Sequence, residues 1–504
     1  MADFATSVRN SYQWDAPSLD IGNAVLDGKL FTDLPVRIPL AMMNRHGLIA
    51  GSTGTGKSRT LQLLAEGLSR NGVPSLVADI KGDLAGVSQP GEASPKILER
   101  VKAMGREFKP EAFPTEFYSL TGARGTQIRA TVTSFGPVLL GKVLELTDTQ
   151  QSVLSMVFKY CDDHRLPLLD FKDLRDALLY LKDHKNELEQ YGGMSPATVG
   201  VLVRKLVELE QQGAQTFFGE PELDINDLMR VQEGKGVINV ISLADVQDKP
   251  RLYSTFMMWL LGQFYFGLPE AGDLDKPKLV FFFDEAHQLF EDASSALVEH
   301  IEQVARLIRS KGIGVFFITQ TPKDIDNDVL AQLGNRVQHA VRAFTPQDAK
   351  DLKSSASTFP PSSFYKVEQT LTSLGIGEAL VSVLNPKGIP TEAVHLRVAT
   401  PSSSMGTIEQ SDYDAARRGS RLASKYATAI DRESAHEILS GKLARAAEVR
   451  ADEEETRARP ARATGRARKE KTVLETVMGS SVGRQAARTV TQQVIRGLFG
   501  LLKR

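Results

Sequence analysis

"GLIAGSTGTGKSRTLQLLAEGLSR", residues 47–70, is the stretch of sequence that decides the fold. An apolar run leads into a glycine-rich segment that matches the pattern G-x-x-x-x-G-K-[ST], and a helical pattern follows it. A strand, a loop and a helix in that order let backbone amides and the helix N-terminus surround phosphate oxygens. The stretch therefore predicts a phosphate-binding loop rather than an ordinary glycine turn before a helix.

Residue types within this loop predict contacts with a nucleotide. Lys57 is expected to reach the β- and γ-phosphates, and the Ser58 hydroxyl is expected to bind Mg²⁺. The other candidate nucleotide contacts are Gly51, Thr53, Gly54, Thr55, Gly56 and Arg59.

A second motif, "LVFFFDEAH" at residues 279–287, places two carboxylates at the end of an apolar strand. Ligands bind at the carboxyl ends of strands in open α/β sheets. Asp284 is expected to orient magnesium, and Glu285 to activate the attacking water as a general base. Adjacent carboxylates also occur in plain turns, but the upstream phosphate loop favours catalysis. Because Glu285 would activate water, the motif favours nucleotide hydrolysis over transfer of phosphate to another acceptor.

A third motif, "GVFFITQTP" at residues 314–322, ends a predicted strand with Gln320. Gln320 is a candidate contact for the γ-phosphate or the attacking water, and the alternative is a polar residue that closes a strand. Asp79 and Asp83 follow another predicted strand, and either lie near the nucleotide or cap the next helix.

Four arginines are candidates for stabilising the negative charge that develops on the γ-phosphate. Such a cation often comes from a neighbouring subunit. The alternative for each arginine is surface solvation or an ion pair, the usual environment of this residue type. The four are Arg306, Arg309, Arg336 and Arg342.

Short apolar runs bounded by turn residues predict buried strands of a parallel sheet covered by helices, an α/β fold. The runs lie at residues 47–51, 75–79, 236–242, 278–285 and 314–320.

The order of patterns along the chain predicts its domain organisation. Residues 1–46 are expected to form an N-terminal β element with a hairpin turn at Asp27–Gly28. Residues 47–400 are expected to form the ATPase core, with a helical insertion at about 140–235. Residues 401–412 read as a linker, and residues 413–504 as a charged helical tail.

Composition indicates a globular protein of a reducing compartment, and we expect it in the cytoplasm. The 504 residues carry a net charge of −1, so binding to nucleic acid or membrane requires a local patch. Cys161 is the one cysteine, which excludes an intrachain disulfide, and no Cys/His spacing suggests a metal site. The apolar stretch 256–268 is shorter than the ~20 residues that span a bilayer, and reads as a buried helix.

The order of "GSTGTGKS", "FFFDEAH" and "ITQTP" resembles the HerA/FtsK branch of ring-forming ATPases. The segments at 44–58, 77–86, 302–348 and 373–382 resemble more closely a bacterial group named HerA-helicase C-terminal-like, or YjgR-like. This resemblance implies a RecA-like P-loop core that assembles into a hexameric ring, with ATP and Mg²⁺ at the subunit interfaces.

By motif position, the resemblance assigns nucleotide roles to Lys57, Ser58, Asp284, Glu285 and Gln320. It also implies that Arg309 acts at or across the interface, with Arg336 as a second candidate.

This chain departs from the HerA pattern in two places. About 45 residues precede the phosphate loop, too few for the β-barrel by which HerA docks a nuclease, so that partnership stays open. Where relatives often show "TQRP", this chain has "TQTP".

Two functions follow as hypotheses, with ATP and Mg²⁺ as cofactors of both. The first is a ring motor that moves along DNA, and the second is a nucleotide-switched assembly platform for protein or membrane partners. The tail, with its basic residues 457–471 and apolar positions between 490 and 502, is a candidate membrane, DNA or subunit contact.

Overall fold

The structure is a computed structural model that describes residues 2–291, 295–343 and 345–458. Contacts between Cα atoms divide the chain into two units, residues 1–441 and 442–504. In the part of the second unit that is described, the chain forms the end of helix α15 (Ala435–Ala458). The tail from residue 459 onward lies outside the described residues, so its predicted contacts stay predictions.

One twelve-stranded sheet organises the first unit, in the order β2-β1-β14-β13-β12-β3-β11-β10-β4-β9-β5-β6. From β12 to β6 all neighbouring strands are parallel, whereas β12, β13, β14, β1 and β2 pair antiparallel. The sheet is mixed and mostly parallel, and helices flank it. The strands are β1 (Ser18–Leu26), β2 (Lys29–Pro39), β3 (Gly47–Ala50), β4 (Ser75–Asp79), β5 (Thr115–Ser119), β6 (Thr126–Gln127), β9 (Ile238–Ser242), β10 (Leu279–Phe283), β11 (Ile313–Thr319), β12 (Asn335–His339), β13 (Glu378–Ser382) and β14 (Val394–Val398).

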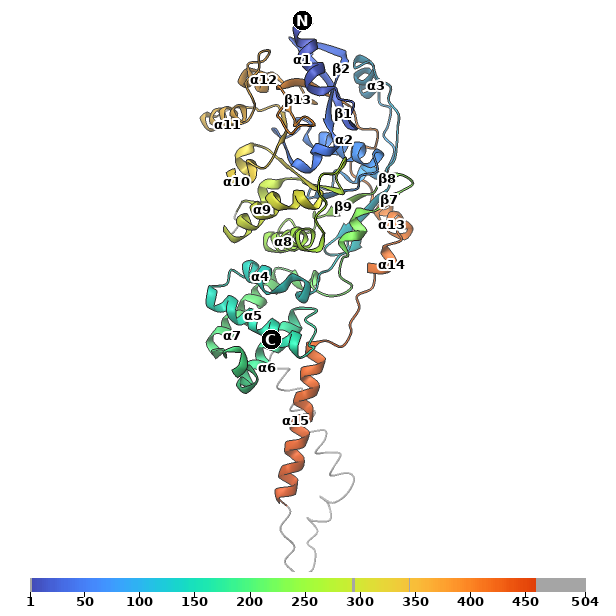
Figure 1. The fold of residues 1–504 in the computed structure, drawn as a ribbon. Helices are drawn as coiled ribbons and strands as arrows, with labels where there is room; N and C mark the ends of the chain where they lie inside the picture. The colour runs from blue at the N-terminus through green and yellow to red at the C-terminus, as the bar shows by residue number, and fades with distance from the viewer. Residues whose placement is uncertain (1, 292–294, 344, 459–504) are drawn as a thin grey trace, which may run out of the picture. The chain divides into compact units, whose positions relative to one another are not determined.

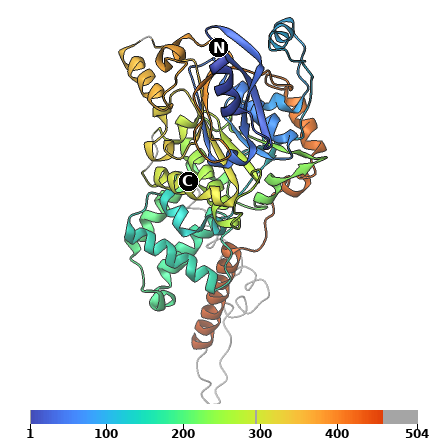
Figure 2. The ribbon, with the colours of Figure 1, turned by 45° about the horizontal axis from the view of Figure 1, so that its top comes forward.

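The core lies on both faces of this sheet because its central strands are apolar on both sides. In β10, Phe281 and Phe283 pack into one cluster with α8 (Pro250–Gly267) and α9 (Ser295–Leu307). Phe282 packs into the opposite cluster, which includes α2 (Lys57–Arg70). Figure 2 shows the strands between blue helices on one side and yellow helices on the other. The alternation explains why β10 can be uniformly hydrophobic.

Helices account for most of the rest of the described chain. The stretch 256–268, predicted as a buried helix, forms most of α8, where Trp259 is fully buried. No helix in the described residues combines the length and apolar character needed to cross a bilayer. The other helices are α1 (Ala2–Tyr12), α3 (Pro95–Ala103), α4 (Val132–Val143), α5 (Asp148–Asp163), α6 (Phe171–Asp183), α7 (Pro196–Gln211), α10 (Asn327–Leu330), α11 (Pro346–Ser357), α12 (Val367–Ser373), α13 (Gln410–Gly419) and α14 (Ala423–Tyr426).

The region expected as a helical insertion, about 140–235, contains α5, α6 and α7, and its helices begin slightly earlier with α4. Figure 1 shows α4 to α7 gathered as one group, and α4 contacts α8 of the core. The region ends in a small antiparallel pair, β7 (Val231–Gln232) and β8 (Lys235–Gly236).

The first 46 residues hold the hairpin β1–β2, whose turn lies at Asp27 and Gly28, both with positive φ. Helix α1 precedes this hairpin, an element that the sequence analysis did not predict. Strand β1 pairs with β14, so the hairpin extends the main sheet.

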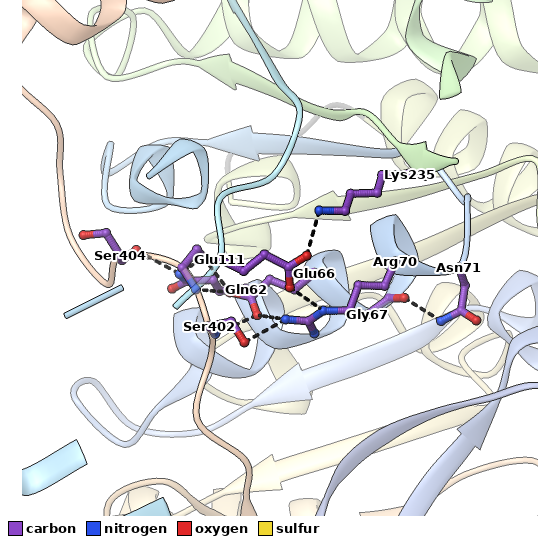
Figure 3. A network of polar contacts seen from close by, with 10 residues as sticks. Gln62, Glu66, Gly67, Arg70, Asn71, Glu111, Lys235, Ser402 and Ser404 are labelled. Atoms are coloured by element: carbon purple, nitrogen blue, oxygen red, sulfur yellow. Dashed lines mark hydrogen bonds and ion pairs between the residues drawn. The ribbon is translucent and has the colours of Figure 1, made fainter. Parts of the chain in front are cut away.

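The segment expected as a linker, 401–412, is attached to the phosphate-loop helix over its first half. We call residues 400–406 the strap. The buried Glu66 carboxylate on α2 accepts hydrogen bonds from the backbone amides of Ser402 (2.8 Å) and Ser403 (2.9 Å). Gln62 donates to the Ser404 carbonyl at 2.9 Å, so α2 binds the strap at consecutive turns (Figure 3). A composition rich in serine suggested a linker, but these serines saturate a buried carboxylate.

The opposite side of the strap is also bonded. The amides of Gly86 and Gly91 donate to the carbonyls of Gly406 and Ser402, each at 3.0 Å. The strap therefore lies between α2 and the loop that follows β4.

Replacing Glu66 with alanine is expected to lower the free energy of unfolding by ~2–4 kcal/mol. The change leaves two backbone amides of the strap without an acceptor in a buried place. Urea denaturation of the full chain measures the loss. Glu99→Ala, which removes an exposed carboxylate of α3, is the control and should change stability by less than ~0.5 kcal/mol. Equal losses in the two variants would contradict the structural role of the strap.

Candidate functional site

The phosphate loop joins β3 to α2 at the carboxyl edge of the sheet. Gly51 has φ of 151°, and a Cβ there would lie 2.5 Å from the Cβ of His339. Gly56, with φ of 121°, precedes the first helical residue and lies close to His339 and Gly377. Glycine is required at both positions, because a side chain would strain the backbone and meet its neighbours.

Neighbouring strands hold the loop in place. The Gly51 amide donates to the carbonyl of Gln320 at 3.1 Å, and the Ser52 amide donates to Ala340 at 3.0 Å. Gly377, just before β13, donates to the Thr55 carbonyl at 2.9 Å. The loop conformation therefore depends on β11, β12 and β13 as well as on its own glycines.

Lys57 is nearly buried, and its ammonium group donates to the carbonyls of Gly51 (2.7 Å) and Ser52 (3.4 Å). Burial lowers the pKa of Lys57, while the carboxylates of Glu285 and Asp284 act in the opposite direction. The side chain is thus folded along its own loop, with the two predicted catalytic carboxylates near enough to act on its charge.

Asp284 and Glu285 follow β10 directly, as predicted. Strand β11 lies between β10 and β3, and all three run parallel. Parallel register brings the end of β10, the end of β11 and the phosphate loop to the same edge.

Glu285 stands in the left-handed region, with φ of 48°. Such a conformation costs of order 1 kcal/mol or more in a residue other than glycine, and often marks a functional site. Its Oε1 forms an ion pair with Lys81, and His287 Nδ1 lies 3.3 Å from its Oε2. Among the described residues, Oε2 has no hydrogen-bond partner although it is buried. One carboxylate oxygen is held by a lysine, and the other is free to accept a proton.

Asp284 is 2% exposed, and its Oδ2 has no hydrogen-bond partner in the described part of the chain. Burial raises the pKa of Asp284 to about 7, and the nearby carboxylates of Glu285, Asp79 and Asp83 add to the effect. The charge of Lys81 opposes this rise, but among the described contacts no hydrogen bond or ion pair to the Asp284 side chain stabilises its charge.

Asp79 was predicted either to lie near the nucleotide or to cap the next helix, and the helical turn that follows, Ala85–Ser88, has Leu84 at its N-cap with no side-chain cap bond. The Asp79 carboxylate accepts the backbone amides of Gly82 (2.7 Å) and Leu84 (3.2 Å), so it holds the turn after β4. It also lies beside Asp284 in the site. Burial, with the charge of Asp83, raises the pKa of Asp79 to about 6.

Gln320, predicted near the γ-phosphate, follows β11 at the correct edge with its side chain exposed. It lines a cleft of about 720 Å³ together with His287, Lys323 and Asp324. The turn beyond it is fixed by Asp324, which accepts a bond from Thr319 Oγ1 at 2.7 Å.

Ser58 is half-buried at the start of α2, while Thr53 and Gly54 are exposed at the tip of the loop. Arg59 lies differently from the other loop residues. Its guanidinium donates to the Met405 carbonyl of the strap and to Gln62 Oε1, both at 2.9 Å. Arg59 therefore connects the phosphate loop to the strap.

Two of the arginine candidates lie at the edge of the sheet opposite the phosphate loop. Arg309 precedes the amino end of β11, and Arg336 lies at the amino end of β12, beside the start of β3. Strand β11 has seven residues, which span roughly 20 Å at ~3.3 Å per residue. The Arg309 guanidinium therefore lies too far away to reach the loop of its own chain, whereas the Arg336 guanidinium donates to the Leu330 carbonyl at 3.2 Å.

The remaining two arginines have different surroundings. Arg306 is exposed and pairs with Glu302 one helical turn away, the environment expected of an ordinary surface arginine. Arg342 follows β12 at the carboxyl edge, and its backbone amide donates to Ser52 Oγ at 3.0 Å. Of the four candidates, Arg342 lies nearest the loop within one chain.

Two residues of the site, Lys81 and His339, were not predicted from the sequence. Lys81 holds Glu285, and its only sequence signal was its position between Asp79 and Asp83 in "DIKGD". His339 contacts the loop glycines and bonds Thr60 Oγ1 at 2.9 Å. Burial lowers the pKa of His339 to about 4, so it is a neutral packing group at physiological pH.

The residues present fit a nucleoside triphosphate with a divalent cation. A glycine cradle and Lys57 stand at a helix N-terminus, which favours phosphate. Unpartnered buried oxygens on Asp284 and Glu285 provide acceptors for a cation and for a water molecule.

Comparisons with known proteins agree with this geometry. A sequence model of the family described as Helicase HerA-like C-terminal matches residues 27–504. The DNA double-strand break repair helicase HerA of Saccharolobus solfataricus is 23% identical over 357 residues, 69% of this chain and 64% of that protein. The protein of the same name from Sulfurisphaera tokodaii is 24% identical over 372 residues, 70% of this chain and 66% of that protein. The chain thus spans slightly less than two thirds of the length of these relatives.

Solved structures share the fold. The unbound bacterial conjugative coupling protein TrwBdeltaN70 has a TM-score of 0.51 at 15% identity, covering 80% of this chain and 93% of that chain. TrwB in complex with the non-hydrolysable ATP analogue ADPNP has a TM-score of 0.50 at 15% identity, covering 79% of this chain and 99% of that chain. The likeness confirms the predicted fold class, a RecA-like P-loop core.

Asp284→Asn is expected to raise the free energy of unfolding at pH 8, in EDTA and without nucleotide, by up to about 4 kcal/mol. Because the pKa of Asp284 is raised from 3.8 to about 7, the wild-type chain loses stability as pH rises through that range. Asparagine carries no such charge, so its advantage should be smaller at pH 5. Urea denaturation at both pH values measures the difference.

The exposed Asp275→Asn is the matched control and should give the same small change at both pH values. An advantage of Asp284→Asn that is equal at pH 5 and pH 8 would contradict the raised pKa.

Proposed function

The chain belongs to the Helicase HerA-like C-terminal family, and from that premise we propose that it is an ATP-hydrolysing ring motor that acts on DNA. The observation that carries the proposal is the arrangement at the carboxyl edge of the sheet. A phosphate loop with Lys57 faces a carboxylate pair whose second member, Glu285, is held by Lys81 with one oxygen free.

Each residue has a defined part in hydrolysis. Lys57 exchanges the loop carbonyls that it bonds for the oxygens of the β- and γ-phosphates. Ser58 and Asp284 would hold Mg²⁺, which would supply neutralisation of the phosphate charge. Glu285 accepts a proton from the attacking water at Oε2, and Lys81 keeps the carboxylate oriented through Oε1. Gln320 contacts the γ-phosphate or the water from the end of β11.

We propose a ring because the family resemblance assigns an arginine to this site that would come from a neighbouring subunit. The two candidates are Arg309 and Arg336. Arg309 precedes the amino end of β11, far from the loop of its own chain, which supports a role at a neighbouring subunit's nucleotide, and Arg336 in β12 is the second candidate. Nucleotide sites shared between subunits let hydrolysis in one subunit be sensed by the next. A hexamer is the arrangement that the family resemblance implies.

DNA is the proposed polymer because the curated relatives carry the name DNA double-strand break repair helicase. With a net charge of −1, the chain needs a local basic surface to bind phosphates, and such binding should weaken steeply with salt.

A second function, a nucleotide-switched assembly platform, is favoured by one observation. Arg59, next to the magnesium-binding Ser58, donates to the Met405 carbonyl of the strap. Nucleotide binding at the loop can therefore alter the segment that leads to the C-terminal helices, where a protein or membrane partner could be held.

Glu285→Gln is expected to retain ATP binding and to lower the hydrolysis rate at least ~100-fold, because general-base catalysis supplies that order of acceleration. We would measure ATP hydrolysis by the full chain with and without double-stranded DNA. The wild-type rate should rise several-fold with DNA, and the variant should stay inactive in both conditions.

The exposed Glu299→Gln is the matched control and should behave as wild type. Hydrolysis that Glu285→Gln abolishes but that neither single- nor double-stranded DNA stimulates would overturn the DNA motor and favour the assembly platform. Unchanged hydrolysis in Glu285→Gln would contradict its role as base.

Arg309→Ala and Lys57→Ala are each expected to be inactive alone, and co-expression of the two chains should restore activity. A site with Lys57 intact can then receive Arg309 from a neighbouring Lys57→Ala chain. In a random equal mixture, roughly one interface in four has both groups, so about a quarter of the wild-type rate is expected. The same mixture with Arg336→Ala tests the second candidate.

Arg306→Ala, which removes an exposed arginine of the same helical segment, is the control and should keep full activity alone. Absence of recovery in both mixtures would overturn arginine action across the interface.

A further inference from the structure

Three carboxylates meet where β4 and β10 end side by side. Asp79 is the last residue of β4, Asp83 lies in the turn after it, and Asp284 follows β10. The two strands are parallel neighbours with Phe283 opposite Ala78, and the Asp284 amide donates to the Ala78 carbonyl at 3.3 Å. Asp79, Asp83 and Asp284 each offer an oxygen, and these oxygens all lie within 4.8 Å of one another.

The cluster holds unpartnered oxygens away from solvent. Asp284 Oδ2 and Asp83 Oδ1 have no hydrogen-bond partner in the described residues, and Asp284 is 2% exposed. Asp79 is 1% exposed and uses its carboxylate to hold the turn, which leaves further lone pairs for a ligand. Buried carboxylates of like charge at this separation repel one another unless a cation or a proton lies between them.

Nearby lysines are engaged elsewhere. Lys81 forms its ion pair with Glu285, and Lys57 donates to the carbonyls of Gly51 and Ser52. Neither lysine has a hydrogen bond or ion pair with any of the three aspartates among the described contacts. The negative charge of the cluster is therefore not balanced by a direct protein partner.

We propose that the nucleotide-free chain binds a divalent cation of the Mg²⁺ and Mn²⁺ class between Asp79, Asp83 and Asp284. Mg²⁺ binds oxygen ligands at about 2.0–2.1 Å, so opposite ligands stand about 4 Å apart, and the oxygens of this cluster, all within 4.8 Å of one another, can approach that spacing. Three carboxylates from two strands form a site before any phosphate arrives.

This binding does not rest on the proposed function, because it requires neither nucleotide nor hydrolysis. If the ATPase assignment is correct, the inference deepens it. The cation is then present before ATP, and the turn after β4, through Asp79 and Asp83, joins Ser58 and Asp284 in controlling when the site is loaded.

The test is a titration of the full-length, EDTA-treated, nucleotide-free protein with Mn²⁺, with free Mn²⁺ read from its paramagnetic resonance signal. One Mn²⁺ should bind per chain, and Mg²⁺ should displace it. Asp83→Asn and Asp284→Asn should each weaken binding at least ~10-fold, because each removes one of three charged ligands.

Asp245→Asn is the matched control. Asp245 follows β9, the neighbour of β4, and it also has a buried unpartnered oxygen, Oδ1, but it does not belong to the cluster. Its replacement should leave Mn²⁺ binding unchanged. Lys57→Ala should lose nucleotide binding and keep Mn²⁺ binding, which separates the cation site from the nucleotide site.

Thermal unfolding gives a second readout that does not depend on the Mn²⁺ signal. Added Mg²⁺ should raise the melting temperature of the wild type and of Asp245→Asn, but not that of Asp83→Asn, which should still fold because removing one like charge relieves repulsion. Absence of Mn²⁺ binding at millimolar concentration would overturn the proposal and leave a proton as the group that stabilises the cluster. Equal binding by Asp83→Asn and Asp245→Asn would overturn it as well.

Discussion

The parallel register of β3, β11, β10 and β4 is the constraint on which the rest of the structure depends. Parallel strands end at one edge, so the residue that follows each strand is delivered to the same place. This edge of the sheet therefore brings together the phosphate loop, Gln320, the Asp284–Glu285 pair and Asp79, although they are far apart in the sequence. The same register places Arg309 at the far edge, before the amino end of β11.

Positive and negative groups at this edge of the sheet are not evenly paired, and the excess negative charge favours binding of a cation. Lys81 and Glu285 neutralise each other, and Lys57 is satisfied by loop carbonyls. The carboxyl groups of Asp79, Asp83 and Asp284 remain without such a partner, and the pKa is raised for Asp79 and for Asp284. A protein interior tolerates such a cluster when a proton or a cation compensates it, because desolvated like charges are costly. The folded chain thus holds unfavourable interactions that a bound cation can relieve.

The strap, residues 400–406, connects the phosphate-loop helix α2 to the C-terminal part of the chain. Glu66 is fully buried on α2 and has its hydrogen-bonding capacity taken up by strap amides. Burial raises the pKa of Glu66, and the strap's donors act against that rise. Helix α2 begins at Lys57 and is hydrogen-bonded to the strap through Arg59, Gln62 and Glu66. A movement of this helix on phosphate binding would therefore displace the strap.

The sequence by itself determined the strand–loop–helix of residues 47–70, the carboxylates after β10, the buried helix α8 and the α/β class. These features follow from local order: glycine spacing, runs of apolar residues and a polar residue directly after a strand. Only the tertiary structure decided which distant residues meet. It attached a serine-rich segment to α2, paired Lys81 with Glu285, gathered three aspartates, and put Arg309 at the opposite edge. The reason is physical, since strand order and direction are set by packing among segments far apart in sequence, and no local pattern encodes them.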